Sequence, residues 1–181
     1  NKHEIFKDTI EWIIETTKWI LRNTDKRIII RQHPVERFDY GKSFDNYGDI
    51  LNKEFGDNDK IIFIGAHEKI NTYDILKQTD LVITHTSTVA MEAVIYGKNV
   101  ITVSSAYYSE MGYVDTPKTR NEYFNNITQI INKNEKVDDD KYIQAVVSYY
   151  VSQKLNRCSP DFLPTTNVNK WIKLSLEEGT E

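Results

Sequence analysis

The chain has little that would suit a disulfide-stapled, membrane-spanning or nucleic-acid-binding protein. Its single cysteine, Cys158, excludes an intrachain disulfide and a thiolate metal site and favours a reducing compartment. Uninterrupted apolar runs, such as residues 61–64, fall far short of the roughly 20 residues of a membrane span. A net charge of −4 argues against binding nucleic acid or anionic membranes through bulk charge.

Several catalytic signatures are also missing. The glycine fingerprint of dinucleotide folds and the P-loop are both absent, which leaves ordinary NAD and NTPase functions with little support. No serine stands in the glycine-flanked pattern of a nucleophile elbow, which weakens a hydrolase interpretation. Paired carboxylates are not evident, because residues 138–140 are typical of a helix cap.

What is present is typical of one globular domain. The 181 residues are 39% apolar and 28% charged, with 7 glycines and 4 prolines. That length suffices for a compact core. Because the chain opens with Asn1 and not with methionine, we expect a piece of a longer protein, one domain spanning residues 1–181.

Short apolar runs alternate with helical patterns along the chain. Strands are expected at residues 27–31, 61–64, 81–84 and 100–103, and helices at 5–21, 47–55, 71–78, 86–96, 120–132 and 142–155, with Asn167 capping a last helix. Such alternation predicts crossover connections and parallel strands. The expected fold is α/β, a single Rossmann-like domain with a parallel sheet, flanking helices and C-terminal helices.

Three of the four histidines, His33, His67 and His85, directly follow expected strands. Ligands of open parallel sheets bind outside the carboxyl ends of the strands, so the three would project toward one edge. Each alone is as often an ordinary loop residue. A three-histidine zinc site finds no support in their spacing, and no metal or cofactor is expected.

A run of hydroxyls, Thr86-Ser87-Thr88, lies between a strand and a helix. Helix N-termini bind phosphate through unpaired N–H groups and a partial positive charge. Ordinary N-capping explains one of these hydroxyls but not three. Glu92, one turn further, could accept hydrogen bonds from a ribose, or it could be a solvated helix carboxylate.

The first strand ends in Arg31-Gln32-His33-Pro34. Proline fixes the turn and removes one backbone donor. An arginine and a histidine at this position could meet a phosphate at the edge of the sheet.

Together these motifs resemble a known family. Residues 28–34, 80–84, 87–93 and 97–101 are similar to the nucleotide-binding half of GT-B glycosyltransferases. Within that group the chain looks most like bacterial capsule and surface polysaccharide biosynthesis proteins, including β-Kdo transferases, and related motifs occur in bacterial polysialyltransferases. Tyr107-Tyr108, Gly112, Pro117 and Tyr123 match a tract that often follows the sheet in the capsule group.

The resemblance implies a donor-binding domain. It implies that His33 and Ser87-Thr88 contact the phosphate of a nucleotide-activated sugar, with a CMP-linked sugar as one candidate, and that Glu92 lies near the ribose. Arg31 and Thr86 join this set, and His67, His85 and Tyr108 are further candidates. Gln32 and Asn99 depart from the family pattern, which frequently has proline at both positions.

The same resemblance implies a division of labour between two domains. The acceptor site, for a glycan or lipid-linked glycan, and usually the catalytic base belong to a facing N-terminal domain. We therefore expect residues 1–181 to bind nucleotide without transferring sugar alone. The family context implies a cytoplasmic protein working at the inner membrane face.

Two alternatives stay open. UDP-sugar 2-epimerases share a similar half-domain, so the chain could be half of such an enzyme, selective for UDP. It could also be a non-catalytic α/β scaffold module. A receiver-like module would want acidic residues at the ends of its early strands, where this chain has Arg31-Gln32-His33 and Gly65-Ala66-His67.

Overall fold

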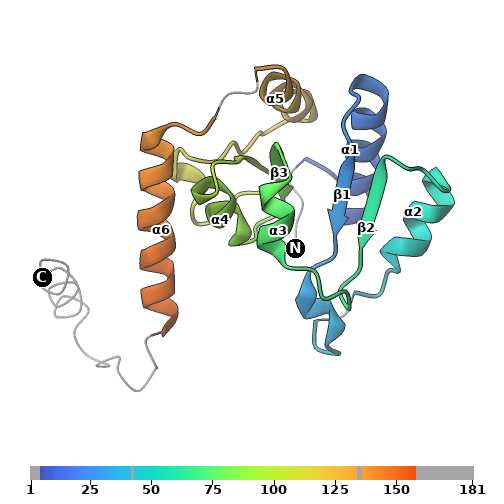
Figure 1. The fold of residues 1–181 in the computed structure, drawn as a ribbon, viewed down its shortest axis with the longest axis horizontal. Coiled ribbons are helices and arrows are strands. Elements are labelled where there is room, and N and C mark those ends of the chain that lie inside the picture. The colour runs from blue at the N-terminus through green and yellow to red at the C-terminus, as the bar shows by residue number, and fades with distance from the viewer. Residues whose placement is uncertain (1–4, 42, 134–135, 158–181) are drawn as a thin grey trace, which may run out of the picture.

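The computed structural model describes residues 5–41, 43–133 and 136–157, with side chains up to residue 153. Strands and helices alternate along these residues (Figure 1). The elements are α1 (Thr9–Asn23), β1 (Ile28–Arg31), η1 (Pro34–Arg37), α2 (Tyr47–Phe55), β2 (Ile61–Ile64), α3 (Thr72–Lys77), β3 (Leu81–Thr84), α4 (Val89–Ile95), β4 (Asn99–Thr102), η2 (Ser109–Met111), α5 (Arg120–Lys133) and α6 (Asp139–Arg157). The α/β class is confirmed. The helix expected after Asn167 lies outside the described residues.

The four strands form two parallel pairs. Ile28 of β1 lies opposite Ile61 of β2, and Leu81 of β3 lies opposite Asn99 of β4. The described strands therefore make two short parallel ladders where the sequence predicted one parallel sheet. An ion pair between Lys26 Nζ and Asp80 Oδ2, 2.6 Å apart, joins the amino ends of β1 and β3.

The β3–β4 pair carries core on one side under α1 and α5. Ile101 and Val103, at the end of the pair, are fully buried there with Phe6, Tyr123 and Ile127. Trp12 and Trp19 of α1 pack against this cluster. The helices α1 and α5 thus bury the apolar strand residues of this side away from water.

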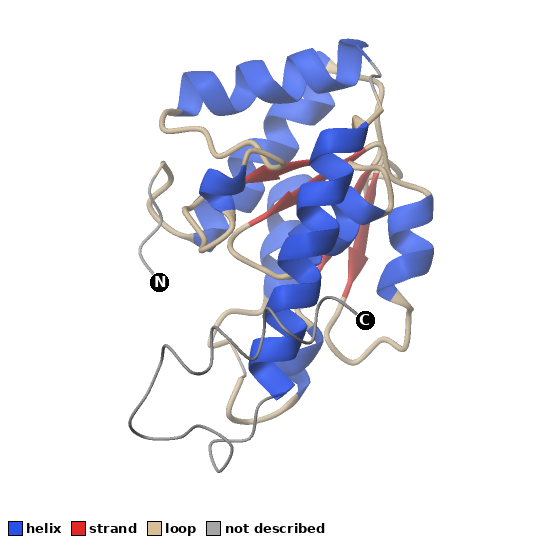
Figure 2. Cartoon of the chain, turned by 90° about the vertical axis from the view of Figure 1, so that its left-hand side faces the viewer, coloured by secondary structure: helices blue, strands red, loops and turns tan. Residues whose placement is uncertain are grey.

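A second core cluster holds α4 against the strands and against α6. Ala90, Met91 and Val94 of α4 are fully buried together with Tyr108 and Ala145. Helices consequently lie around the strands in both views of the chain (Figure 2). None of the helices in the described ranges is long and apolar enough to cross a membrane.

Local capping explains where helices begin and end. The helix expected from residue 5 begins at Thr9, because the Asp8 side chain accepts the Glu11 N–H at 2.8 Å. Gly56 and Gly97 follow α2 and α4 with φ of 62° and 73°, the left-handed region that glycine adopts at low cost. The fourth strand starts one residue earlier than expected, at Asn99.

Candidate functional site

The carboxyl ends of β1 and β2 are tied together by Gln32. Its backbone N–H donates to the Ile64 carbonyl at 2.9 Å, and its side-chain oxygen accepts the Ala66 N–H at 3.2 Å. Its amide nitrogen also donates to Glu36 Oε2 at 3.0 Å. This one side chain therefore fixes the start of η1 against the turn after β2. A proline, frequent here in the resembling family, could not do so.

His33 stands exposed at the start of η1. Its Nδ1 accepts the Val35 N–H at 3.1 Å, so the neutral ring carries its proton on Nε2. Pro34 takes the first position of η1, where no backbone donor is needed. The imidazole is thereby held as a hydrogen-bond donor at the end of β1. His67 is likewise exposed, in the turn after β2.

Arg31, the last residue of β1, has two guanidinium nitrogens without a hydrogen-bond partner in the described part of the chain. These atoms, Nε and Nη1, are both buried. A buried donor without a partner costs about 1–3 kcal/mol, and more when it is charged. Nε and Nη1 lie on different edges of the guanidinium: each edge that binds phosphate or carboxylate in a bidentate manner combines Nη2 with one of these two atoms.

The carboxyl ends of β3 and β4 are joined by His85. Its Nε2 lies 3.0 Å from Ser104 Oγ, and its Nδ1 lies 3.3 Å from Thr86 Oγ1. His85 thus bridges the two strands of the pair, which is a positioning role. Ser104 was missed by the sequence analysis, although it too directly follows a strand.

The entrance to α4 uses one of the three hydroxyls for capping, the number that ordinary N-capping explains. The helix begins at Val89, and only Ser87 caps it, its Oγ accepting the Val89 N–H at 3.3 Å. Thr88, the residue before the helix, makes no side-chain capping bond. Thr86 and Thr88 are exposed. Two of the three hydroxyls are therefore not needed for capping.

Tyr108 fixes the backbone at the start of α4 through a hydrogen bond to Ser87. It is fully buried, and its hydroxyl donates to the Ser87 carbonyl at 2.7 Å. Burial raises the pKa of its phenol above the usual range, so it stays a neutral donor. Tyr108 is therefore a positioning residue for Ser87.

Glu92 lies between two tyrosines that approach from other helices. The hydroxyls of Tyr73 in α3 and Tyr149 in α6 donate to its carboxylate. Burial raises the pKa of Glu92 above its usual value, and the two hydrogen bonds partly oppose that rise. The carboxylate joins three helices.

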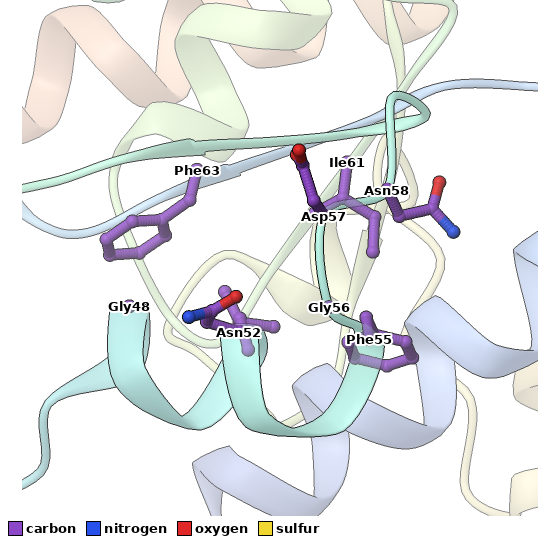
Figure 3. Close-up of a pocket in the computed structure, with 9 residues that line it drawn as sticks. Gly48, Asn52, Phe55, Gly56, Asp57, Asn58, Ile61 and Phe63 are labelled. Carbon is purple, nitrogen blue, oxygen red and sulfur yellow. The ribbon is translucent and has the colours of Figure 1, made fainter.

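Two hollows border these elements. One, of about 440 Å³, lies beside the loop that follows β4, and its lining includes Ser105, Tyr107, Thr116 and Lys118. Lys118 Nζ donates a hydrogen bond to Ser105 Oγ at 3.0 Å. Ser105 and Lys118 were not singled out from the sequence, because their contact joins positions thirteen apart across a loop. The other, of about 150 Å³, lies between α2 and β2 and includes none of the candidate residues (Figure 3).

The described residues hold no group of three or more His, Cys, Asp or Glu side chains that could bind a metal ion. The chemistry on offer is that of anion recognition. A guanidinium, an imidazole N–H and hydroxyls stand at the carboxyl ends of the strands. The contacts above fall into one group on the β1–β2 pair and one on the β3–β4 pair.

Comparison with known proteins gives one match. A family model described as capsule polysaccharide biosynthesis protein matches residues 3–152, a range that includes every candidate residue named above. Neither the curated proteins nor the solved structures yield a significant match.

Proposed function

Because the chain belongs to the capsule polysaccharide biosynthesis protein family, we propose that it binds the nucleotide-activated sugar donor of a glycosyltransferase. The observation that carries this proposal is the Arg31 guanidinium, with two buried nitrogen atoms that lack a partner in the described chain. A phosphate of the donor that accepts from one of these atoms, with Nη2 as the second donor of the same edge, would remove part of the cost of their burial.

His33 supplies the next donor in this proposal. It follows Arg31 by two residues, and its Nδ1 contact keeps the proton on Nε2. Negative charge accumulates on the nucleotide phosphate as the sugar departs. Preorganised donors aimed at that charge stabilise the transition state without a metal ion.

The second group of residues would hold the rest of the nucleotide. The exposed hydroxyls of Thr86 and Thr88 are assigned to the ligand, while Ser87 and Tyr108 shape the loop. The ribose is placed beside Glu92. A carboxylate has about four lone-pair sites, so it can accept a ribose hydroxyl besides the two tyrosines.

The acceptor site and the catalytic base are assigned to a facing domain, as the GT-B resemblance implies. In this proposal residues 1–181 bind donor in the cytoplasm, at the inner membrane face, and the acceptor is a growing surface glycan or its lipid-linked form. Sugar transfer by this chain alone would contradict that division.

Calorimetric titration with CMP, CDP, UDP, GDP and inorganic phosphate tests the proposal. We expect selective binding of one nucleotide, weakened about 10- to 100-fold in Arg31→Met, since a bond to a charged group contributes about 1.5–3 kcal/mol. His33→Ala should weaken binding as well. The matched control is Arg27→Met, which removes an exposed arginine just before the amino end of the same strand.

Each outcome separates one alternative. CMP selectivity supports a CMP-linked donor, whereas UDP selectivity favours half of a UDP-sugar 2-epimerase-like enzyme. Binding of phosphate without preference for a base would contradict nucleotide recognition. No binding at millimolar ligand would overturn the proposal and favour a scaffold module, and equal binding by Arg31→Met would overturn the role assigned to Arg31.

A further inference from the structure

The outer side of α6 is apolar and exposed. Figure 1 shows α6 along one edge of the molecule, with β1, β2 and α2 toward the opposite edge. Six apolar side chains of α6 are between 37% and 59% exposed, and they recur in pairs four residues apart, the spacing of one side of a helix. We call this set the α6 stripe: Tyr142, Ile143, Val146, Val147, Tyr150 and Val151. Exposed apolar patches of this kind mark interaction surfaces.

The opposite side of α6 already packs on the core. Ala145 is fully buried in the cluster around α4, and Tyr149 packs against the same cluster. Residues 142–153 contain no charged side chain. A helix side that faces water ordinarily carries charged and polar residues, so this composition indicates that the stripe meets a partner.

The order of side chains along the stripe matches the stripe of a second copy. Each end carries a tyrosine followed by an aliphatic residue, and two valines, Val146 and Val147, lie midway. When two such helices meet antiparallel, with a two-fold axis at these valines, the tyrosine end of each copy lies against the tyrosine end of its partner. A two-fold interface requires a surface that is self-complementary in this way.

Charge at the start of α6 favours the antiparallel arrangement over the parallel one. Asp139 and Asp140 stand exposed in the first turn of the helix. Parallel packing would bring these carboxylates of the two copies together, where like charges repel. Antiparallel packing separates them by the length of the helix. It also places the positive N-terminal end of each helix dipole beside the negative C-terminal end of its partner.

The area of the stripe suits a weak, reversible dimer. A buried tyrosine contributes about 150–250 Å² and a buried valine or isoleucine about 60–120 Å². Because the six side chains are about half exposed, the stripe offers roughly 400 Å² in each copy and roughly 800 Å² in both. Interfaces below about 1,200 Å² belong to transient complexes, so we expect a dissociation constant on the order of 10 μM.

We propose that the α6 stripe is the interface of a homodimer, in which the α6 helices of two copies pack antiparallel about a two-fold axis at Val146 and Val147. Ile143 of one protomer lies beside the tyrosine at position 150 of its partner, because the two positions are equally far from the axis. The interface does not involve Arg31 or His33. Dimer formation is therefore independent of nucleotide binding.

Sedimentation velocity of the full 181-residue chain between about 1 and 200 μM tests the proposal, since a dimer forms by mass action. Wild type should change from monomer to dimer across this range. Ile143→Glu combined with Val147→Glu should stay monomeric, because the dimer would bury four carboxylates near its axis. The matched control Phe44→Glu, at an exposed aromatic residue outside α6, should dimerise like wild type.

Two outcomes would overturn the proposal. Wild type that stays monomeric at every concentration would show that no second copy covers the stripe. A dimer that survives the double change would assign the interface to another surface. Far-UV circular dichroism of the variant should match wild type, so that loss of the dimer is distinguished from unfolding, and its nucleotide affinity should be unchanged.

Disulfide trapping tests the position of the axis. Two cysteines bridge only when their Cα atoms lie within about 7 Å, a condition that residues at a two-fold axis meet with their own copies. With Cys158→Ser as background, Val147→Cys under a mild oxidant should give a disulfide-linked dimer in most of the protein. Gln129→Cys, at an exposed position on α5, is the matched control and should cross-link far more slowly. Equal cross-linking rates at the two positions would contradict the proposed interface.

Discussion

The two strand pairs differ in the hydrogen-bond partners of the polar side chains at their carboxyl ends. On the β3–β4 pair the polar groups satisfy one another: His85 with Ser104, and Tyr108 with Ser87. On the β1–β2 pair His33 stands exposed and Arg31 keeps two buried atoms without a partner in the described chain. In the proposed function the donor phosphate therefore meets the β1–β2 pair, while the β3–β4 pair offers only the exposed hydroxyls of Thr86 and Thr88.

The strands also differ in how deeply their residues are buried. Three of the four residues of β4 are buried, whereas β2 has one buried residue and the residues of β1 and β3 are all half-buried. Stability should therefore be concentrated around β3–β4 and ligand affinity around β1–β2. Substitutions that affect one property and spare the other can test this contrast.

The largest stability effect is expected from Tyr123→Phe. Tyr123 is fully buried, and its hydroxyl bonds with Thr16 Oγ1 at 2.8 Å and Trp12 Nε1 at 3.1 Å. Its loss removes both of these buried hydrogen bonds to α1, at a cost of about 2 kcal/mol. Urea denaturation measures the loss. Tyr40→Phe, at a position 82% exposed, should cost nearly nothing. An equal loss of stability in both variants would contradict the expectation that stability is concentrated around β3–β4.

Tyr108→Phe should cost about 1 kcal/mol, since one buried hydrogen bond to the Ser87 carbonyl disappears. Because Ser87 caps α4, nucleotide affinity should fall several-fold as well. The neighbouring change Tyr107→Phe removes only a 3.8 Å contact to the Met91 sulfur and serves as the control. If both changes lowered stability and affinity equally, the positioning role of Tyr108 would be wrong.

Glu92→Gln should stabilise the protein at neutral pH by roughly 0.5 kcal/mol, a small effect because the carboxylate keeps part of its hydration. Burial raises the pKa of Glu92, so the folded state holds the proton more tightly than the unfolded state. That contribution is fully present below the unfolded pKa and is lost as pH rises through the folded pKa. Glutamine avoids this loss and still accepts from Tyr73 and Tyr149.

Thermal unfolding at pH 7.5 and near pH 4 measures the difference. The gain of Glu92→Gln over wild type should shrink toward the lower pH. A variant less stable than wild type at pH 7.5 would show that the ionised carboxylate stabilises the three-helix junction.

The smallest effect on stability is expected from the Lys26–Asp80 ion pair, which joins the amino ends of β1 and β3. Lys26 and Asp80 are about half exposed, and such ion pairs contribute at most about 0.5 kcal/mol. Asp80→Asn should therefore change stability little, and about 1 M salt should abolish the difference. A loss several times larger would show that the strand pairs depend on each other more than their separate ladders indicate.

Much of the fold could be predicted from local sequence. Strands 61–64 and 81–84 and the helix 47–55 have the predicted bounds, because apolar runs and the glycine at 56 are local signals. The division into two ladders was not predictable, since it depends on how separate segments pair.

The candidate site shows the same limit. Arg31, His33 and His85 were candidates because chain order places them at strand ends, and the structure has them there. The tyrosine partners of Glu92 come from positions 73 and 149, and no sequence spacing connects these to it. That Arg31 is buried without a partner likewise depends on tertiary packing, which the sequence alone does not contain.

The free energy of unfolding of wild type and Arg31→Met, with and without millimolar nucleotide, tests the central claim most directly. Without ligand, the variant should be at least as stable as wild type, because methionine brings no unsatisfied donors. Nucleotide at a hundredfold excess over its Kd should stabilise wild type by about 2.7 kcal/mol and the variant much less. A variant that is strongly destabilised without ligand, yet still stabilised fully by nucleotide, would contradict the account.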